Sequence, residues 1–317
     1  MKNFLTSPVL TVAVPPHIHC GKTVKGLSLH TIYALIPAIL FAVAHYGIDA
    51  IRVMALSCAV AVVTEYLCAM VMEQEAAIDD LSSVVIGLIF AFILPASAPW
   101  WLVVMGSVSS IALGKMIFGG IGGAPVCAAA LGWAICRVSW PHAMDIEACM
   151  LSAPWDYPLG QLKHFGVEYM HPASLVEMFF GNQLGWLGAS QVGAVLLGGI
   201  YLLWKGWLRP YIPIAFLVGV FIGAFSFYDL DPTQYASPIF HLFAGGTVFA
   251  AFFLATDPSS SPSGSRAMIL YGLLGGVLTV IIRVYGKYPD GVVFAVLLAN
   301  LFAPLIERIR PKPFGAR

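Results

Sequence analysis

Charged side chains are scarce in this sequence of 317 residues. They make up 10% of the chain, whereas a soluble domain carries about 25%. Hydrophobic residues reach 59%, above the roughly 45–50% of a soluble domain. A water-soluble fold is therefore excluded. The 16 basic and 16 acidic residues cancel and form no basic block, so we expect no nucleic-acid partner.

The sequence also lacks the motifs of several kinds of site. Its six cysteines form no CxxC pair and no ferredoxin-like spacing. His17 and His19, with Cys20 beside them, have no further convergent ligands at a readable spacing, so we expect no metal site. Residues 1–27 have neither the apolar core nor the cleavage site of a secretory signal, and we expect an uncleaved amino terminus.

Long apolar runs fill most of the chain. Runs near 20 residues match the roughly 30 Å hydrocarbon core at about 1.5 Å per residue. They predict an all-α polytopic membrane protein of about ten transmembrane helices. Pro95, Pro99, the stretch 119–123 and Gly245-Gly246 interrupt the runs, so we expect some broken helices. The predicted segments are 28–46, 50–72, 81–96, 98–118, 121–139, 191–206, 209–227, 237–255, 266–284 and 291–308.

Basic residues predict the orientation. With ten segments, 11 of the 16 Lys and Arg residues fall on the side of the amino terminus, and the remaining five, Arg283 among them, fall opposite. The positive-inside rule then places both termini in the cytoplasm. The predicted organisation is an amino-terminal segment (1–27), a first transmembrane half (28–139), an outer-face insertion (140–190), a second transmembrane half (191–308) and a cytoplasmic tail (309–317).

A short pattern occurs at equivalent places in the two halves. A Gly-Lys pair followed four residues later by Gly lies at 114–119, between the fourth and fifth segments, and at 286–291, between the ninth and tenth. Because each half has an odd number of segments, the pattern predicts two inverted five-helix repeats. Chance matching of common loop residues is the alternative.

Three ionisable residues lie in or beside apolar segments, where a charge is costly and often functional. Asp80 opens the third segment, Asp257 ends the eighth, and His241 lies inside the eighth. We take them as candidates for an ion path or a flavin site. The alternatives are a helix-terminal charge at Asp80, a turn at Asp257-Pro258 and a hydrogen-bonded structural histidine.

A Gly-rich stretch, 181–191, closes the insertion just before the sixth segment. It does not follow a strand and does not fit GxGxxG, so a dinucleotide fold is not indicated. Ser190 offers a hydroxyl, expected to be exposed, at the mouth of a helix whose free N–H groups favour a phosphate.

Several motifs in a fixed order carry a resemblance to a known family. The chain resembles, from about residue 15 to its end, the D subunit of Rnf electron-transport complexes and the B subunit of the Na⁺-translocating NADH:quinone reductase. The motifs are Pro16-His17-Ile18-His19, Asp80-Leu81-Ser82-Ser83, Pro99-Trp100-Trp101, Gly114-Lys115, the Gly-rich 119–123, Ala255-Thr256-Asp257-Pro258 and the stretch 288–298 that begins Tyr-Pro-Asp-Gly.

The resemblance implies a flavin. The family's D subunit carries FMN joined through its phosphate to a threonine in a Gly-x-x-Gly-Glu-Thr-Ser loop. The matching loop here has Gly185 and Gly188, with Ser190 in place of the threonine, Ala189 in place of the glutamate and Gln191 in place of the serine. A serine hydroxyl forms the same phosphoester. The resemblance therefore implies covalent FMN at Ser190, attached by a flavin transferase, and a second, noncovalent flavin such as riboflavin.

The function implied is that of a membrane subunit in a complex that passes electrons between ferredoxin and NAD⁺ while moving Na⁺ or H⁺. The chain has no nicotinamide or iron–sulfur motif, so it is not an enzyme alone and needs partner subunits that carry flavin and iron–sulfur centres. Two alternatives stay open. One is a flavin-free inverted-repeat channel or transporter, and the other is a structural subunit that has lost its covalent flavin.

Overall fold

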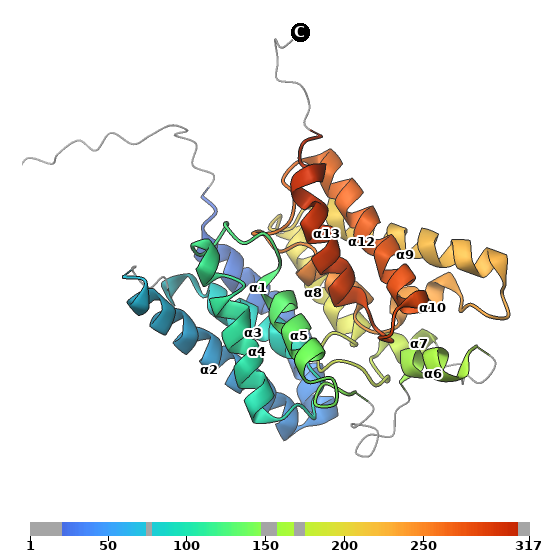
Figure 1. Cartoon of the computed structure of the whole chain (residues 1–317), viewed down its shortest axis with the longest axis horizontal. Coiled ribbons are helices and arrows are strands. Elements are labelled where there is room, and N and C mark those ends of the chain that lie inside the picture. Colours follow the sequence, from blue (N-terminus) through green and yellow to red (C-terminus); the bar gives the residue numbers. More distant parts are fainter. Residues whose placement is uncertain (1–20, 74–77, 147–156, 168–174, 310–317) are drawn as a thin grey trace, which may run out of the picture.

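The computed structural model describes residues 21–73, 78–146, 157–167 and 175–309, and within these ranges it is built of helices (Figure 1). The first half contains α1 (Val24–Tyr46), α2 (Ile48–Val71), α3 (Ser82–Phe92), α4 (Trp100–Ala112) and α5 (Ala128–Ser139). The second half contains α8 (Val192–Trp204), α9 (Tyr211–Leu230), α10 (Pro238–Phe243), α11 (Thr247–Phe249), a π-helical stretch (Ala250–Leu254), α12 (Ser265–Tyr285) and α13 (Val292–Ile306). Two short helices, α6 (Pro158–Phe165) and α7 (Leu175–Phe179), lie between the halves in the sequence.

These elements fall on the ten predicted segments. Five are long and apolar enough to cross a membrane: α1, α2, α4 with the turn that follows it, α9 and α12. Four more, α3, α5, α8 and α13, are apolar but shorter. The remaining segment is the broken helix α10–α11. The prediction of an all-α polytopic membrane protein with some broken helices is confirmed.

Proline and glycine set where the short helices end. α3 stops at Phe92, just before Pro95, and α4 starts directly after Pro99. Proline has no N–H and disfavours a helical residue before it, so the chain between them cannot continue either helix. α10 stops at Phe243, and Gly245 takes a positive φ of 63° before α11 begins. Both stops leave helix carbonyls without their usual partners.

The two halves run in opposite directions. α1 packs along α8, and the Nζ of Lys22, just before α1, donates to the carbonyl of Gly206, just after α8. The first helices of the two halves are thus antiparallel. Within the halves, α2 packs on α3 and α4 as α9 packs on α10 and α12, and α4 packs on α5 as α12 packs on α13. This arrangement is that of an inverted repeat.

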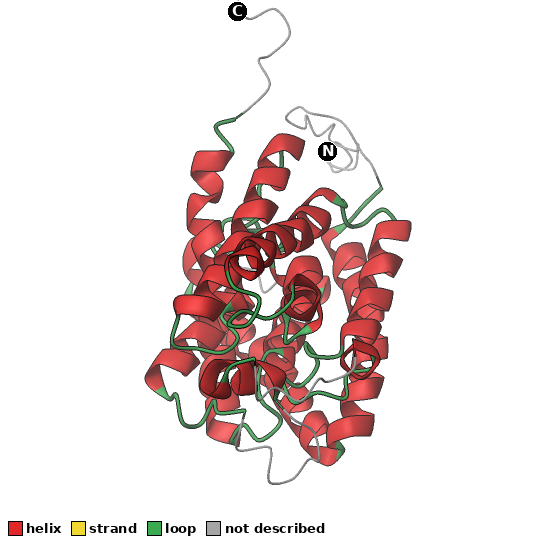
Figure 2. Ribbon diagram, turned by 90° about the vertical axis from the view of Figure 1, so that its right-hand side faces the viewer, coloured by secondary structure: helices red, strands yellow, loops and turns green. Residues whose placement is uncertain are grey.

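The start of α1 and the end of α13 lie at the same end of the molecule (Figures 1 and 2). Hydrogen bonds tie this end together, from Arg209 to the carbonyl of Ser263 and from the Ser263 amide and hydroxyl to Glu307. We call it the terminal face. The opposite end, which holds α6 and α7, is the insertion face (Figure 1).

Candidate functional site

The loop that contains Ser190 is buried. Ser190 is 1% exposed, and its Oγ donates a hydrogen bond to the Trp186 carbonyl at 2.9 Å. The expectation of an exposed hydroxyl is therefore wrong. The reason lies at the end of α3, where backbone carbonyls accept from this loop. Leu187 N–H donates to the carbonyl of Leu94, just past the helix, at 2.8 Å, and the N–H groups at positions 188 and 189 donate to that of Phe92, its last residue, at 3.2 Å. The loop supplies the donors that α3 lacks at its end.

The two glycines of this loop allow its close packing. A Cβ on Gly188 would lie 2.7 Å from the Phe92 ring, and one on Gly185 would lie 2.6 Å from the Ser190 Cβ. Contacts under 3.0 Å cannot form without displacement, so both positions need glycine. The structure thus explains Gly188 by packing against α3 and Gly185 by packing against Ser190 within the loop.

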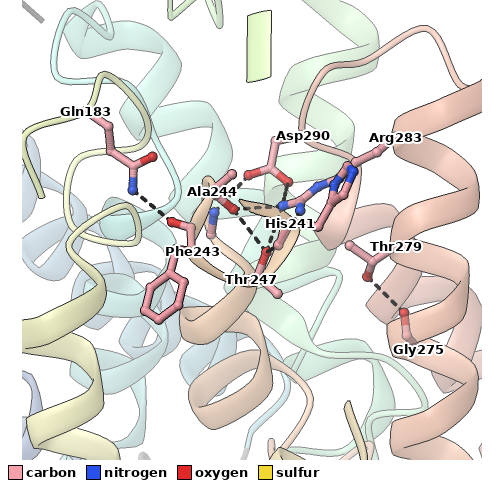
Figure 3. A network of polar contacts seen from close by, with 10 residues as sticks. Gln183, His241, Phe243, Ala244, Thr247, Gly275, Thr279, Arg283 and Asp290 are labelled. Carbon is pink, nitrogen blue, oxygen red and sulfur yellow. Dashed lines mark hydrogen bonds and ion pairs between the residues drawn. The ribbon is translucent and has the colours of Figure 1, made fainter. Parts of the chain in front are cut away.

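The same loop contacts the broken helix of the second half. The buried Gln183 amide donates from Nε2 to the Ser190 carbonyl at 2.9 Å and to the Phe243 carbonyl, at the end of α10, at 3.0 Å (Figure 3). The Trp186 ring lies against Gly246, where a Cβ would be 2.3 Å from it. The Ser190 loop therefore joins the end of α3 to the break between α10 and α11.

An arginine fills the break. Arg283, near the end of α12, donates from Nη1 to the His241 carbonyl at 2.8 Å, and from Nη2 to the Ala244 carbonyl at 3.0 Å and to Thr247 Oγ1 at 2.8 Å (Figure 3). Its Nη2 also pairs at 3.0 Å with Oδ1 of Asp290, and both side chains are buried. The guanidinium satisfies carbonyls that the break leaves free, as the membrane interior requires.

Asp290 completes this arrangement from the turn before α13. Its Oδ2 accepts from the Gly246 N–H at 2.9 Å. A Cβ on Gly245 would lie 2.2 Å from the same Oδ2. The carboxylate therefore holds the guanidinium and the backbone of the break together.

His241 lies where the sequence predicted a functional candidate, but its backbone carbonyl makes the contacts described above. Its ring is buried, and Nδ1 has no hydrogen-bond partner among the described residues. The ring borders a cavity of about 410 Å³ that also reaches Arg283, Lys163 and Tyr235. Lys163 in α6 donates to the carbonyls of Arg283 and Val284, both at 2.9 Å.

Sequence reasoning missed Arg283, Thr247 and Asp290. It counted Arg283 as an outer-face charge because the residue lies near the end of the ninth segment. A charged residue inside an apolar run is itself the signal of a buried functional or structural group. Thr247 and Asp290 carry no such signal, since a hydroxyl in a helix and an acid beside glycine are both common.

The other two candidates lie toward the terminal face. Asp80 Oδ1 accepts from the N–H and Oγ of Ser82, the first residue of α3, at 2.8 and 2.6 Å, which is the position that the helix-terminal alternative describes. The Ser82 Oγ also accepts from Nζ of Lys115 at 2.6 Å, and Lys115 forms a buried ion pair with Glu65 of α2.

Asp257 borders a second cavity of about 370 Å³ between the two halves. The walls combine Val85 of α3 and Lys115 from the first half with Trp207 and Phe253 from the second. Asp257 Oδ2 accepts from Ser260 Oγ at 3.1 Å. Burial raises the pKa of Asp257 to about 6, although hydrogen bonds from Ser260 act in the opposite direction.

The predicted residues therefore form two groups. Ser190 and His241 belong to one network toward the insertion face, while Ser82, which donates to Asp80, shares the second cavity with Asp257. Within the described residues, no group of three or more His, Cys, Asp or Glu side chains could hold a metal ion. His17, His19 and Cys20 lie outside those residues.

Comparison with known proteins decides the family. Residues 11–315 match the model of the NQR2, RnfD, RnfE family. The chain belongs to this family. The resemblance predicted from the ordered motifs is confirmed over nearly the full length.

Members of this family from several bacteria are similar along their whole lengths. The D subunit of the proton-translocating ferredoxin:NAD⁺ oxidoreductase complex of Clostridium ljungdahlii is 34% identical over 321 residues, covering 98% of this chain and 97% of the relative. The D subunit of the Na⁺-translocating ferredoxin:NAD⁺ oxidoreductase complex of Acetobacterium woodii is 35% identical over 304 residues, covering 94% and 93%. The D subunit of the ion-translocating oxidoreductase complex of Yersinia pseudotuberculosis is 30% identical over 345 residues, covering 96% and 98%.

Proposed function

We propose that this chain is the D-type membrane subunit of an ion-translocating ferredoxin:NAD⁺ oxidoreductase complex of the Rnf type. The similarity to the D subunits of such complexes over 93–98% of both chains carries the proposal. The sequence has no nicotinamide or iron–sulfur motif, so partner subunits supply those centres. The protein lies in the bacterial inner membrane with the terminal face in the cytoplasm, in keeping with its excess of basic residues.

Orientation has a direct test. A fluorescent protein fused after the carboxy-terminal tail should fluoresce in cells. Alkaline phosphatase fused within the outer-face insertion should be active, because that enzyme folds only outside the cytoplasm. The opposite pattern in both fusions would reverse the orientation.

The proposal includes a flavin carried by this subunit. As folded here, Ser190 does not fit a flavin phosphoester, since its Oγ is buried and donates to the Trp186 carbonyl. Attachment of FMN at Ser190 therefore requires the loop to leave α3. The altered residues around Ser190 and its burial both favour the alternative of a subunit without covalent flavin.

In-gel flavin fluorescence of the denatured protein separates these two forms. Wild type and Ser190→Ala are each coexpressed with a flavin transferase, and the mass of the peptide that contains position 190 is measured by mass spectrometry. Fluorescence in the wild type alone, with an FMN-phosphate mass on the peptide, supports a covalent carrier. A dark wild-type band excludes the covalent carrier and favours a noncovalent flavin or the flavin-free structural or channel function.

The cavity between the halves fits the noncovalent flavin implied by the family resemblance. It has the size of a cofactor pocket, apolar walls that include Trp207 and Phe253, and polar groups from Lys115 and Asp257. Acid denaturation should release one flavin from the purified wild type. Thr31→Trp, which fills the cavity from α1, should release none, while Leu197→Trp, on the exposed side of α8, should match the wild type.

A further inference from the structure

The break between α10 and α11 gathers oxygen atoms around one positive charge. The carbonyl of Ala244, Oγ1 of Thr247 and Oδ1 of Asp290 lie 2.8–3.0 Å from Nη2 of Arg283, and the His241 carbonyl lies 2.8 Å from Nη1 (Figure 3). Two carbonyls at the carboxyl end of α10, a hydroxyl and a carboxylate are oxygen ligands of the kind that hard cations take. Broken helices in transporters coordinate Na⁺ with such carbonyls.

The charges in this break balance with a single cation. Asp290 contributes one negative charge, and the guanidinium of Arg283 neutralises it. Lys163 is another nearby cation, but its Nζ donates to the carbonyls at the end of α12. Without the guanidinium, the four oxygens would keep an unpaired buried charge, which is strongly unfavourable.

The guanidinium also has a route out of the break. Arg283 lines the 410 Å³ cavity toward the insertion face, and its Nε has no hydrogen-bond partner among the described residues. The side chain is thus anchored by its two terminal nitrogens. Release of those contacts would leave the oxygens open to a cation that enters through the cavity.

We propose that this break is a monovalent-cation site whose resident cation is the guanidinium of Arg283, and that Na⁺ binds there when that side chain is withdrawn or removed. The ligands are the carbonyls of His241 and Ala244, the Thr247 hydroxyl and the Asp290 carboxylate. This site extends the proposed function by adding one ion-binding position on this chain. It stands on the geometry of this chain alone, and its test uses no electron transfer or flavin.

Removal of the guanidinium gives the test. Arg283→Ala is purified as the full chain, and its thermal unfolding is followed in NaCl and in choline chloride at equal ionic strength. We expect a lowered unfolding temperature in choline chloride and a saturable rise of roughly 5 °C with NaCl, because a ligand that binds the folded state stabilises it. Wild type should unfold at the same temperature in both salts.

Two controls separate site binding from a general effect of salt. Arg137→Ala removes another guanidinium that donates to carbonyls, those of Pro141 and Met144, and should show no preference for Na⁺. Asp290→Ala combined with Arg283→Ala should abolish the preference, because the charged ligand is gone.

Several results would overturn the proposal. They are equal unfolding of R283A in both salts, a Na⁺ effect that survives loss of Asp290, and rescue by free guanidinium without rescue by Na⁺. Failure of R283A to fold in Na⁺-containing medium also counts against it, since Na⁺ should fill the site. Arg283→Gln keeps an amide donor in the break. A folded R283Q without a Na⁺ response would contradict the proposal in the same way.

Discussion

Buried charges are the most consequential single residues in this protein. Lys115 and Glu65 are each about 3% exposed, and they pair across 50 positions of sequence, from the turn after α4 to α2. Ser82 and Ser83 at the start of α3 add acceptors for the same ammonium. The pair thus ties three helices of the first half together.

Breaking this pair should destabilise the fold. Lys115→Met or Glu65→Gln leaves an uncompensated buried group, at a cost of about 3–5 kcal/mol in the free energy of unfolding. The double variant should lose much less free energy of unfolding than the two single variants together, because both charges are then absent. Unfolding in detergent with increasing denaturant measures each cost.

An exposed pair serves as the matched control for that cycle. Arg52 and Asp49 lie 3.4 Å apart on α2, with side chains 46% and 61% exposed. Arg52→Met should cost about 1 kcal/mol or less. The importance of the buried pair would be contradicted if the losses of stability in the Lys115 and Glu65 variants were additive, or if they were as small as the loss in Arg52→Met.

Asp257 should make stability depend on pH. Its pKa in the fold is about 6, above the value near 4 of an unfolded aspartate, so the folded state binds more protons between these values. The free energy of unfolding should therefore fall as pH rises from about 4 to about 6. Asp257→Asn should flatten this dependence of the free energy of unfolding on pH, whereas Asp49→Asn, at an exposed site, should leave it unchanged. Unfolding temperatures across this pH range test the prediction.

Two interrupted helices complete each other through the Ser190 loop. α3 ends early and needs donors, and the loop before α8 supplies them; α10 ends early and needs donors, and Arg283 with Gln183 supplies them. Unpaired backbone groups are too costly inside a membrane to be left without partners. The breaks are thus possible only because the Ser190 loop meets the end of α3 and α12 meets the end of α10.

Gly245 should be essential to the second break. Gly245→Ala adds a Cβ about 2.2 Å from Asp290 Oδ2 at a residue with a φ of 63°, so both the conformation and the ion pair are disturbed. Gly119 has a similar positive φ of 87° but open space around its Cβ position. We expect Gly119→Ala to cost about 1–2 kcal/mol and Gly245→Ala clearly more. Thermal unfolding compares them, and equal costs would show that the carboxylate contact is unimportant.

At the scale of the whole molecule, the α1–α8 contact joins the two halves. Gly198 of α8 lies so close to α1 that a Cβ there would be 2.0 Å from the Ala34 carbonyl oxygen. The neighbouring cavity lies between the same halves, so a change in helix spacing also changes its walls.

Widening this contact should loosen the molecule. Gly198→Ala should cost about 1–3 kcal/mol in the free energy of unfolding, because the helices must move apart. Gly264→Ala, whose nearest atom would be 3.8 Å away, should change stability little. If both variants unfold like the wild type, the halves are not held by close packing at Gly198.

The sequence alone determined the solvent, the segments and the family of this protein. The lengths of the apolar runs fix how many times the chain can cross a membrane, and proline and glycine positions mark the interruptions at α3 and α10. Such properties are local, so one sequence is enough to read them. The ordered motifs likewise identified the family.

Only the tertiary structure decided which side chains form the site. Ser190 is buried because its loop donates to α3, and Arg283 fills the break after α10 by binding the carbonyl of His241, 42 residues earlier in the chain. Local pattern does not encode such partners, because a buried polar group can be satisfied by any donor or acceptor that the fold brings near it. The folded arrangement of the chain determines which donor or acceptor lies within hydrogen-bonding distance.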